Sequence, residues 1–290
     1  MHHGPAVRRR KLGAELRRRR NLAGLTSGEA ARLVGWHQSK VSRIETGRSG
    51  VRPADVERLL DAYDVRDEES RALLAALCGQ DAGGGSGGDA GRGWWHTYRD
   101  LLPPQYRDFI SLEAGASHAR TLETTVVPGL LQTPDYARAV TRAALADLPQ
   151  SRIDALVDVR IARQSVLEGD PPLKLSAVLD EAVLRRPAGG PEVMKAQLRH
   201  LLKVMELPHV RLQVLPFTAG VHIGITGPFV IFSFPLIADL DVVVLDHLTS
   251  SLYLERKEDL RAYSDAFDTL RGHALSCEES SALIARAAEG

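Results

Sequence analysis

The sequence predicts a small all-α domain joined by a flexible linker to a larger α+β domain. Apolar residues with helical spacing, interrupted by glycine and proline, run through residues 9–77. Eight glycines then occupy the fifteen positions 79–93, where little can pack. Runs rich in β-branched and aromatic residues, typical of strands, begin only after residue 172. We therefore place the domains at 1–78 and 94–290, with the linker at 79–93.

Residues 9–77 carry the start and stop signals of five short helices. Gly35 separates the second helix from the third, and Thr46 with Gly47 ends the third. Proline in the first turn is typical of the start of the fourth helix. The five are expected at 9–22, 27–34, 38–45, from Pro53 onward, and from a cap at Asp67 to about residue 77.

The second and third helices have the pattern of a helix-turn-helix motif. Ala31 is the small residue at the helix contact, Gly35 supplies the turn, and Val41 and Ile44 are the apolar anchors. The remaining residues of the third helix then form an exposed polar and basic face. Because such a face fits the major groove of DNA, we expect an all-α helix-turn-helix domain that binds double-stranded operator DNA.

Seven side chains are candidate DNA contacts. Gln38 suits the edge of adenine and Arg43 the edge of guanine, whereas Ser39 and Ser42 can reach bases or phosphates. Phosphate contacts are expected from three further residues: Ser27, Lys40 and Arg48. The run Arg17 to Arg20 fits a solvated helix face and a contact to the DNA backbone equally well.

Charge is distributed unevenly along a chain whose formal net charge is zero. Residues 1–60 hold 14 Lys or Arg against 5 Asp or Glu, a net +9, which leaves 23 against 32, a net −9, for the rest. This asymmetry is expected if only the first domain contacts phosphate. Two cysteines and no apolar run of 18 residues predict a soluble, cytoplasmic protein without a membrane segment.

The second domain is expected to contain one mixed or antiparallel sheet flanked by helices. Its predicted helices are 105–122, 134–145 with a cap at Thr133, 151–168, 191–205, 258–274, and 276–288 with a Ser276 and Glu279 capping box. Its predicted strands are 173–179, 210–216, 228–234 and 241–246.

No enzyme or cofactor is predicted for the second domain. It lacks G-x-S-x-G, H-E-x-x-H, a P-loop and C-x-x-C, and the literal G-x-G-x-x-G of the linker follows a helix instead of a strand. Asp180 and Glu181 are expected to cap a helix or pair with arginine, and His222 and His247 to be structural. The glycine-containing loop 218–228 is typical of a segment that admits a ligand or partner.

Segments of both domains resemble known families. The segment LGAELRRRRNLAGLTSGEAARLVGWHQSKVSRIETGR resembles the xenobiotic-response-element (XRE) class of phage-repressor-like helix-turn-helix proteins. Here Ser27 stands where a glutamine often braces the first DNA contact, and His37 where Ser or Thr normally caps the recognition helix. The segments VPGLLQTPDYARAV, RIARQ, LDEAVLRRPAGG and VLPFTAGVH resemble a domain of unknown function that many actinomycete (actinobacterial) regulators carry.

The resemblance implies a transcriptional regulator, often paired with a small protein encoded nearby and in places antitoxin-like. The leading hypothesis is a homodimeric regulator, dimerised mainly through its second domain, in which that domain binds a small partner protein or ligand to control DNA binding. The first alternative is an antitoxin-like protein that neutralises its partner and autoregulates its operon. The second is an enzyme with a helix-turn-helix head. No metal or other cofactor is expected.

Overall fold

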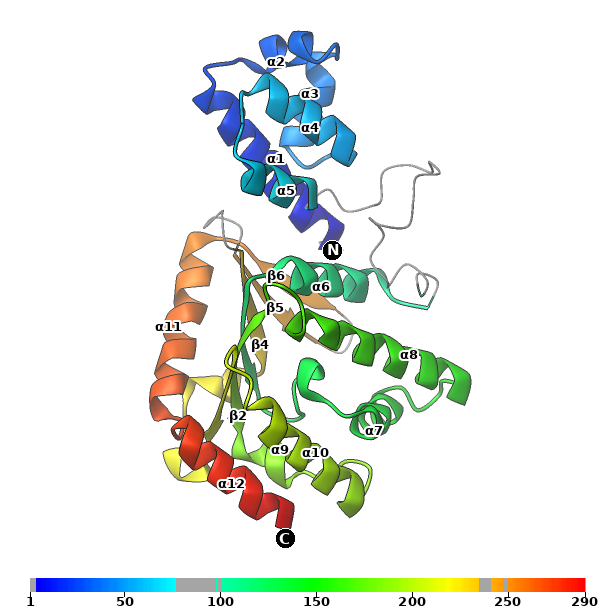
Figure 1. The fold of residues 1–290 in the computed structure, drawn as a ribbon, viewed down its shortest axis with the longest axis vertical. Coiled ribbons are helices and arrows are strands. Elements are labelled where there is room, and N and C mark those ends of the chain that lie inside the picture. The colour runs from blue at the N-terminus through cyan, green and yellow to red at the C-terminus, as the bar shows by residue number, and fades with distance from the viewer. Residues whose placement is uncertain (1–3, 77–97, 99–100, 235–240, 248–249, 290) are drawn as a thin grey trace. The chain divides into compact units, whose positions relative to one another are not determined.

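The structure is a computed structural model that describes residues 4–76, 98, 101–234, 241–247 and 250–289. It divides into two compact units, each described here by itself (Figure 1). The predicted linker at 79–93 lies outside the described residues. The predicted fold class is confirmed: a helical N-terminal region precedes a domain built on a six-stranded mixed sheet with flanking helices.

The first unit contains the five predicted helices: α1 (Gly4–Leu22), α2 (Ser27–Leu33), α3 (Gln38–Glu45), α4 (Pro53–Ala62) and α5 (Glu68–Ala76). Gly35 and Gly47 have φ values of 69° and 67°, a conformation that favours glycine and that ends α2 and α3 as predicted. Asp67 caps α5 by accepting a hydrogen bond from the Ser70 amide at 3.0 Å.

Thr26 and Glu29 form a capping box at the start of α2 that we did not predict. The Glu29 amide donates to the Thr26 hydroxyl at 3.2 Å, and the Thr26 amide donates to the Glu29 carboxylate at 2.8 Å. The same carboxylate accepts from the Thr26 hydroxyl, which lowers the pKa of Glu29. Thr-x-x-Glu is the sequence pattern of a capping box, so the start of this helix at Ser27 could be predicted from the sequence.

In the second unit the strands have the order β3-β2-β1-β4-β5-β6. They are β1 (His118–Glu123), β2 (Lys174–Asp180), β3 (Val210–Leu215), β4 (Phe229–Ser233), β5 (Val242–Asp246) and β6 (Ser251–Leu254). The pairs β1–β2 and β2–β3 are parallel, and the other three pairs are antiparallel. The sheet is therefore mixed.

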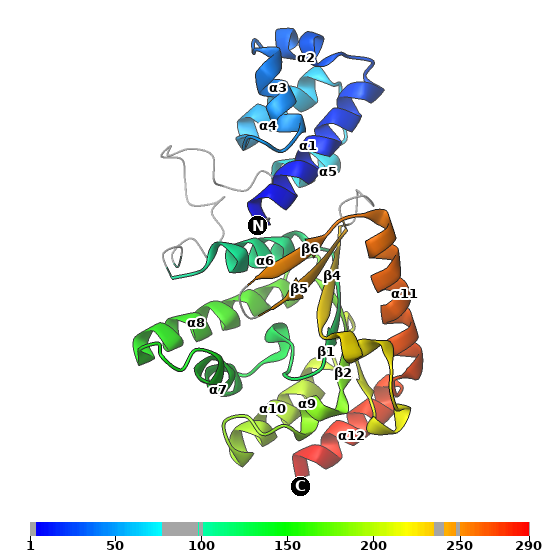
Figure 2. The same ribbon diagram turned by 180° about the vertical axis from the view of Figure 1, so that it is seen from behind.

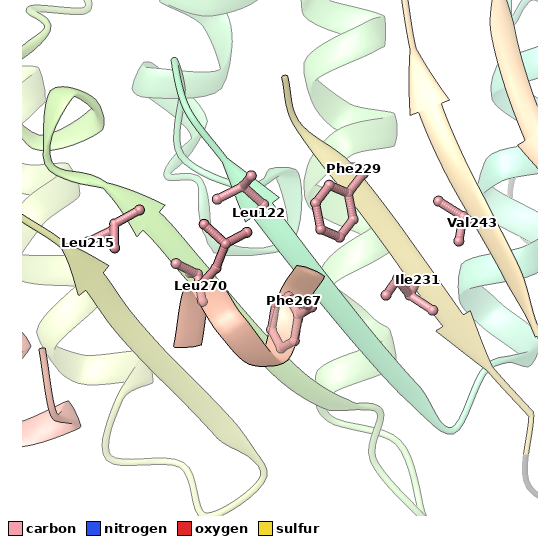
Figure 3. Packing of buried hydrophobic residues seen from close by; sticks show 8 residues of the cluster. Leu122, Leu215, Phe229, Ile231, Val243, Phe267 and Leu270 are labelled. Carbon is pink, nitrogen blue, oxygen red and sulfur yellow. The ribbon is translucent and has the colours of Figure 1, made fainter. Parts of the chain in front are cut away.

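Helices flank both faces of this sheet. The helices that follow residue 101 are α6 (Pro104–Gly115), of which residues 104–111 belong to the first unit, α7 (Pro134–Ala144), α8 (Gln150–Ala162), α9 (Glu181–Arg185), α10 (Pro191–Val204), α11 (Lys257–His273) and α12 (Cys277–Glu289), with 3-10 turns at Gly129–Leu131, Arg163–Leu167, Phe217–Ala219 and Ile223–Thr226. In Figures 1 and 2, α11 covers one face, and α7 and α8 lie on the other. Phe267 and Leu270 of α11 join Leu122, Phe229 and Ile231 of the sheet in a buried core (Figure 3).

The predicted helix at 105–122 is wrong in its second half. Helix α6 ends at Gly115, and residues 118–123 form β1, which pairs with β2 on one side and β4 on the other. Pairing along both edges of this strand outweighs the helix-forming composition of LEAGASHARTLE. The predicted helix at 151–168 likewise stops being α-helical at Ala162, and the four-residue strand β6 was not predicted.

Candidate nucleic-acid interface

Helix α3 presents the predicted base-reading residues on its outer face. Val41 and Ile44 are 0% and 1% exposed and anchor the opposite face to the core. The four outward residues occupy adjacent rows of the helix, and all are exposed: Gln38, Ser39, Ser42 and Arg43. Arg43 and the exposed Arg48 form no ion pair with any of the described residues, so both guanidinium groups are available to an anion.

Ser27 and Gln38 are hydrogen-bonded to each other. The side-chain amide of Gln38 donates to the Ser27 hydroxyl at 3.1 Å, joining the start of α2 to the start of α3. His37, the N-cap residue of α3, makes no side-chain cap bond. With one amide hydrogen directed to Ser27, Gln38 keeps its other hydrogen and its oxygen for the two contacts that adenine requires.

Lys40 is already engaged within the protein. Its ammonium lies 3.2 Å from a carboxylate oxygen of Asp55 in α4 and 3.5 Å from the centre of the Trp36 ring. Asp55 is buried, and Arg52 is its second partner, at 3.5 Å. Lys40 therefore ties α3 to α4 and to the turn before α3. A phosphate contact by Lys40 would have to compete with these two interactions.

Arg20 and Glu45 form a buried ion pair that joins α1 to the end of α3. Two hydrogen bonds of 2.7 and 3.0 Å link the guanidinium to the carboxylate, and a third, of 2.6 Å, reaches the Leu25 carbonyl. The Glu45 hydrogen bond raises the pKa of Arg20. Both interpretations of the basic run are therefore wrong for Arg20. Its position four and eight residues after Leu16 and Leu12, on the buried stripe, was the signal for burial.

Gly13 permits the close approach of α1 to the last turn of α3. A Cβ atom at this position would lie 2.3 Å from the Ile44 carbonyl oxygen and 2.7 Å from that of Glu45. No other residue fits without a shift of backbone. Gly13 and the Arg20–Glu45 pair together fix where the recognition face lies relative to α1.

Two family models match the chain. Residues 106–286 match the family described as a domain of unknown function (DUF5753). The chain belongs to the DUF5753 family. Residues 11–74 match a helix-turn-helix domain, which makes this DUF5753 protein a DNA-binding regulator. The comparison with curated proteins gave no match, and neither did that with solved structures. No helix in the described ranges is long and apolar enough to cross a membrane.

In the DUF5753 domain the candidate carboxylates have structural partners. Asp180 caps α9 by accepting from the Ala182 amide at 2.8 Å, and Glu181 pairs with Arg185 at 3.1 Å, as predicted. His222 lies 3.5 Å from Asp180, and His247 is exposed. Among the described residues there is no group of three or more His, Cys, Asp or Glu side chains that could hold a metal ion.

Glu123, at the end of β1, is the most strongly perturbed carboxyl group described in the DUF5753 domain. Burial raises its pKa to about 8, and the charge of Asp246 adds to the shift. Thr121 and Arg160 of α8 act in the opposite direction. The sequence does not single out Glu123, because its burial depends on strand β1, where the local composition predicts a helix.

Proposed function

We propose that this DUF5753 protein is a sequence-specific transcriptional regulator of the XRE class that reads operator DNA through α3. Gln38, Ser39, Ser42 and Arg43 contact bases in the major groove. Ser27 and Arg48 contact phosphates, and Lys40 does so in competition with its contacts to Asp55 and Trp36. The observation that carries the proposal is the exposed face of α3, on which Arg43 has no ion-pair partner among the described residues and Gln38 is oriented by Ser27.

Replacement of one arginine on this face tests the proposal. An operator is first selected from random DNA with the unaltered protein, and binding is then measured for Arg43→Ala and for Arg58→Ala. Both residues are exposed and carry the same charge, but Arg58 lies on α4 and is not among the candidate DNA contacts. We expect Arg43→Ala to lose about 10- to 100-fold in affinity and to relax base preference at one position. Equal affinities and equal preferences in the two variants would refute the proposal.

The domain organisation supports a regulated dimer. We propose domains at 1–78 and 94–290, joined by a glycine-rich tether at 79–93. This tether would let the helix-turn-helix domains of the two copies reach operator half-sites about one helical turn apart. In this proposal the protein is a cytoplasmic homodimer, and the second domain binds a small partner protein or ligand that controls DNA binding. A tether of this glycine content would transmit no strain, so in this proposal control acts through dimerisation or through the spacing of the two helix-turn-helix domains.

The antitoxin-like alternative differs in what the partner does. It assigns the second domain to neutralising a small partner protein encoded nearby, with DNA binding serving autoregulation. Purification of the native protein followed by mass spectrometry distinguishes the two readings when the recovered partner is added back to an operator-binding assay. A partner that changes operator affinity supports control of DNA binding. A partner that leaves operator affinity unchanged supports the alternative.

A further inference from the structure

Exposed apolar side chains are concentrated in one segment between β3 and β4, residues 217–227, here called the apolar loop. Phe217, Val221, Ile223 and Ile225 are 60%, 88%, 49% and 73% exposed. The other exposed large hydrophobic residues described are scattered: Leu22, Leu33, Leu145, Leu207 and Leu252. The apolar loop contains no Asp, Glu, Lys or Arg. Such a concentration marks an interaction surface.

The apolar loop is held in place by its polar and glycine residues. The Phe217 amide donates to Glu181 at 3.0 Å, and His222 lies 3.5 Å from Asp180 while its Nδ1 accepts from the Gly224 amide at 3.2 Å. Gly224 is buried, and a Cβ there would lie 2.9 Å from the Leu122 side chain. Since these groups anchor the loop to the end of the sheet, beside α11 (Figure 2), the apolar side chains are presented in a fixed arrangement.

We infer that the apolar loop is the centre of the homodimer interface, an inference that rests on the proposed function. The adjoining helix α9 carries charges of both signs, with Asp180 and Glu181 at its start and the exposed Arg185 and Arg186 at its end. In a two-fold contact each patch meets its own copy. The apolar side chains then bury one another, and the charges at the two ends of α9 sum to zero, so they give the rim no net repulsion between the copies.

The charges on and beside the apolar loop argue against a lipid membrane as its binding partner. Interfacial segments that insert in membranes combine apolar residues with Lys and Arg, which anionic lipids attract. The apolar loop has no charged residue, and the two acids and two arginines at the ends of α9 sum to zero, so this surface has no excess of basic charge to attract anionic lipids. A second copy of the chain, which offers the same uncharged patch and a rim of both signs, fits this surface better.

The size of the patch sets the expected strength of the dimer. Four side chains that each bury about 100 Å² contribute on the order of 400 Å² per copy, and about 800 Å² in the pair. Stable interfaces bury about 1,200 to 2,000 Å², so the apolar loop supplies the centre and α9 extends it. An interface near the lower end of this range is typical of weak, transient association, so occupation of paired half-sites would depend steeply on protein concentration.

Sedimentation equilibrium of the full chain tests the inference with Ile225→Asp and the control Leu145→Asp. Leu145 and Ile225 are both exposed, but Leu145 follows α7 and lies outside the apolar loop. We expect the unaltered protein and Leu145→Asp to dimerise, and Ile225→Asp to dimerise at least about 10-fold more weakly. A monomer at about 100 μM in the unaltered protein, or equal dimerisation of all three proteins, would overturn the inference.

A second measurement separates this inference from the DNA-binding proposal. Binding to a single operator half-site depends on one head, so Ile225→Asp should leave it unchanged while weakening binding to the full operator. Arg43→Ala should do the reverse: it should lose half-site affinity and still dimerise. Normal dimerisation of Ile225→Asp would therefore contradict the interface without affecting the role of α3, whereas normal half-site binding by Arg43→Ala would contradict only the DNA-binding proposal.

Discussion

Substitution of Gly13 by alanine tests whether close packing of α1 on α3 outweighs helix propensity. In a helix interior, Gly→Ala stabilises by about 1 kcal/mol when space allows. At Gly13 the new Cβ would lie 2.3 Å from the Ile44 oxygen, about 1 Å inside ordinary contact, which begins at 3.4 Å. Because both opposing atoms are backbone, the helices must separate. Overpacking of this kind costs about 1 to 3 kcal/mol, so we expect a net loss of up to about 2 kcal/mol.

Hydrogen exchange of the α3 amides in the full chain measures this change in the first unit alone. Gly28→Ala is the matched control, since the nearest atom to its Cβ would be the Thr26 hydroxyl at 3.9 Å. We expect slower or unchanged exchange in Gly28→Ala and faster exchange in Gly13→Ala, with weaker operator binding in the latter because α3 has moved. Exchange in Gly13→Ala as slow as in the unaltered protein would refute the packing argument.

Three further substitutions test other parts of the structure. The pKa of Glu123 is about 8 in the folded protein and 4.5 ordinarily, so the stability that this group contributes is greatest below pH 4.5 and falls as the pH rises to 8. Glu123→Gln should therefore flatten the decline of the thermal unfolding temperature with pH. An unchanged pH profile would contradict the burial of this carboxyl group. Glu45→Ala leaves the buried Arg20 charge without its carboxylate partner, so the free energy of unfolding of the first unit, measured by hydrogen exchange, should fall by about 3 to 5 kcal/mol. A loss below about 1 kcal/mol would contradict a buried ion pair. Gln38→Ala and Ser27→Ala should be non-additive in operator binding, and additivity contradicts their coupling.

Local sequence patterns predicted the first unit well because its helices are short-range structures. Glycine at Gly35 and Gly47, proline at Pro53 and the cap at Asp67 act through neighbouring backbone, so their effect is readable from spacing alone. The exposed face of α3 followed directly from its buried anchors. The Ser27–Gln38 bond was not predicted, because it spans eleven residues and depends on how two helices meet.

Long-range pairing explains what the sequence did not reveal in the second unit. Strand β1 has helix-forming composition and becomes a strand because β2 and β4, more than fifty and one hundred residues later, pair with its two edges. The pKa of Glu123 is raised because its place at the end of that strand buries it and puts it near Asp246. The strands that were predicted, such as β4 and β5, are rich in Val, Ile and Phe, so their local composition agreed with their final environment.

The pairing of Lys40 with Asp55 affects how salt should control operator binding. Each phosphate that a basic side chain neutralises releases condensed counterions from DNA, with a slope of about −0.9 in log affinity against log salt. Arg20 and Lys40 are already neutralised by carboxylates within the first unit, whereas Arg43 and Arg48 are not paired with any described residue. The count of 14 Lys and Arg in residues 1–60 therefore overstates the number of ions released, and affinity should fall less steeply with ionic strength than this count of basic residues suggests.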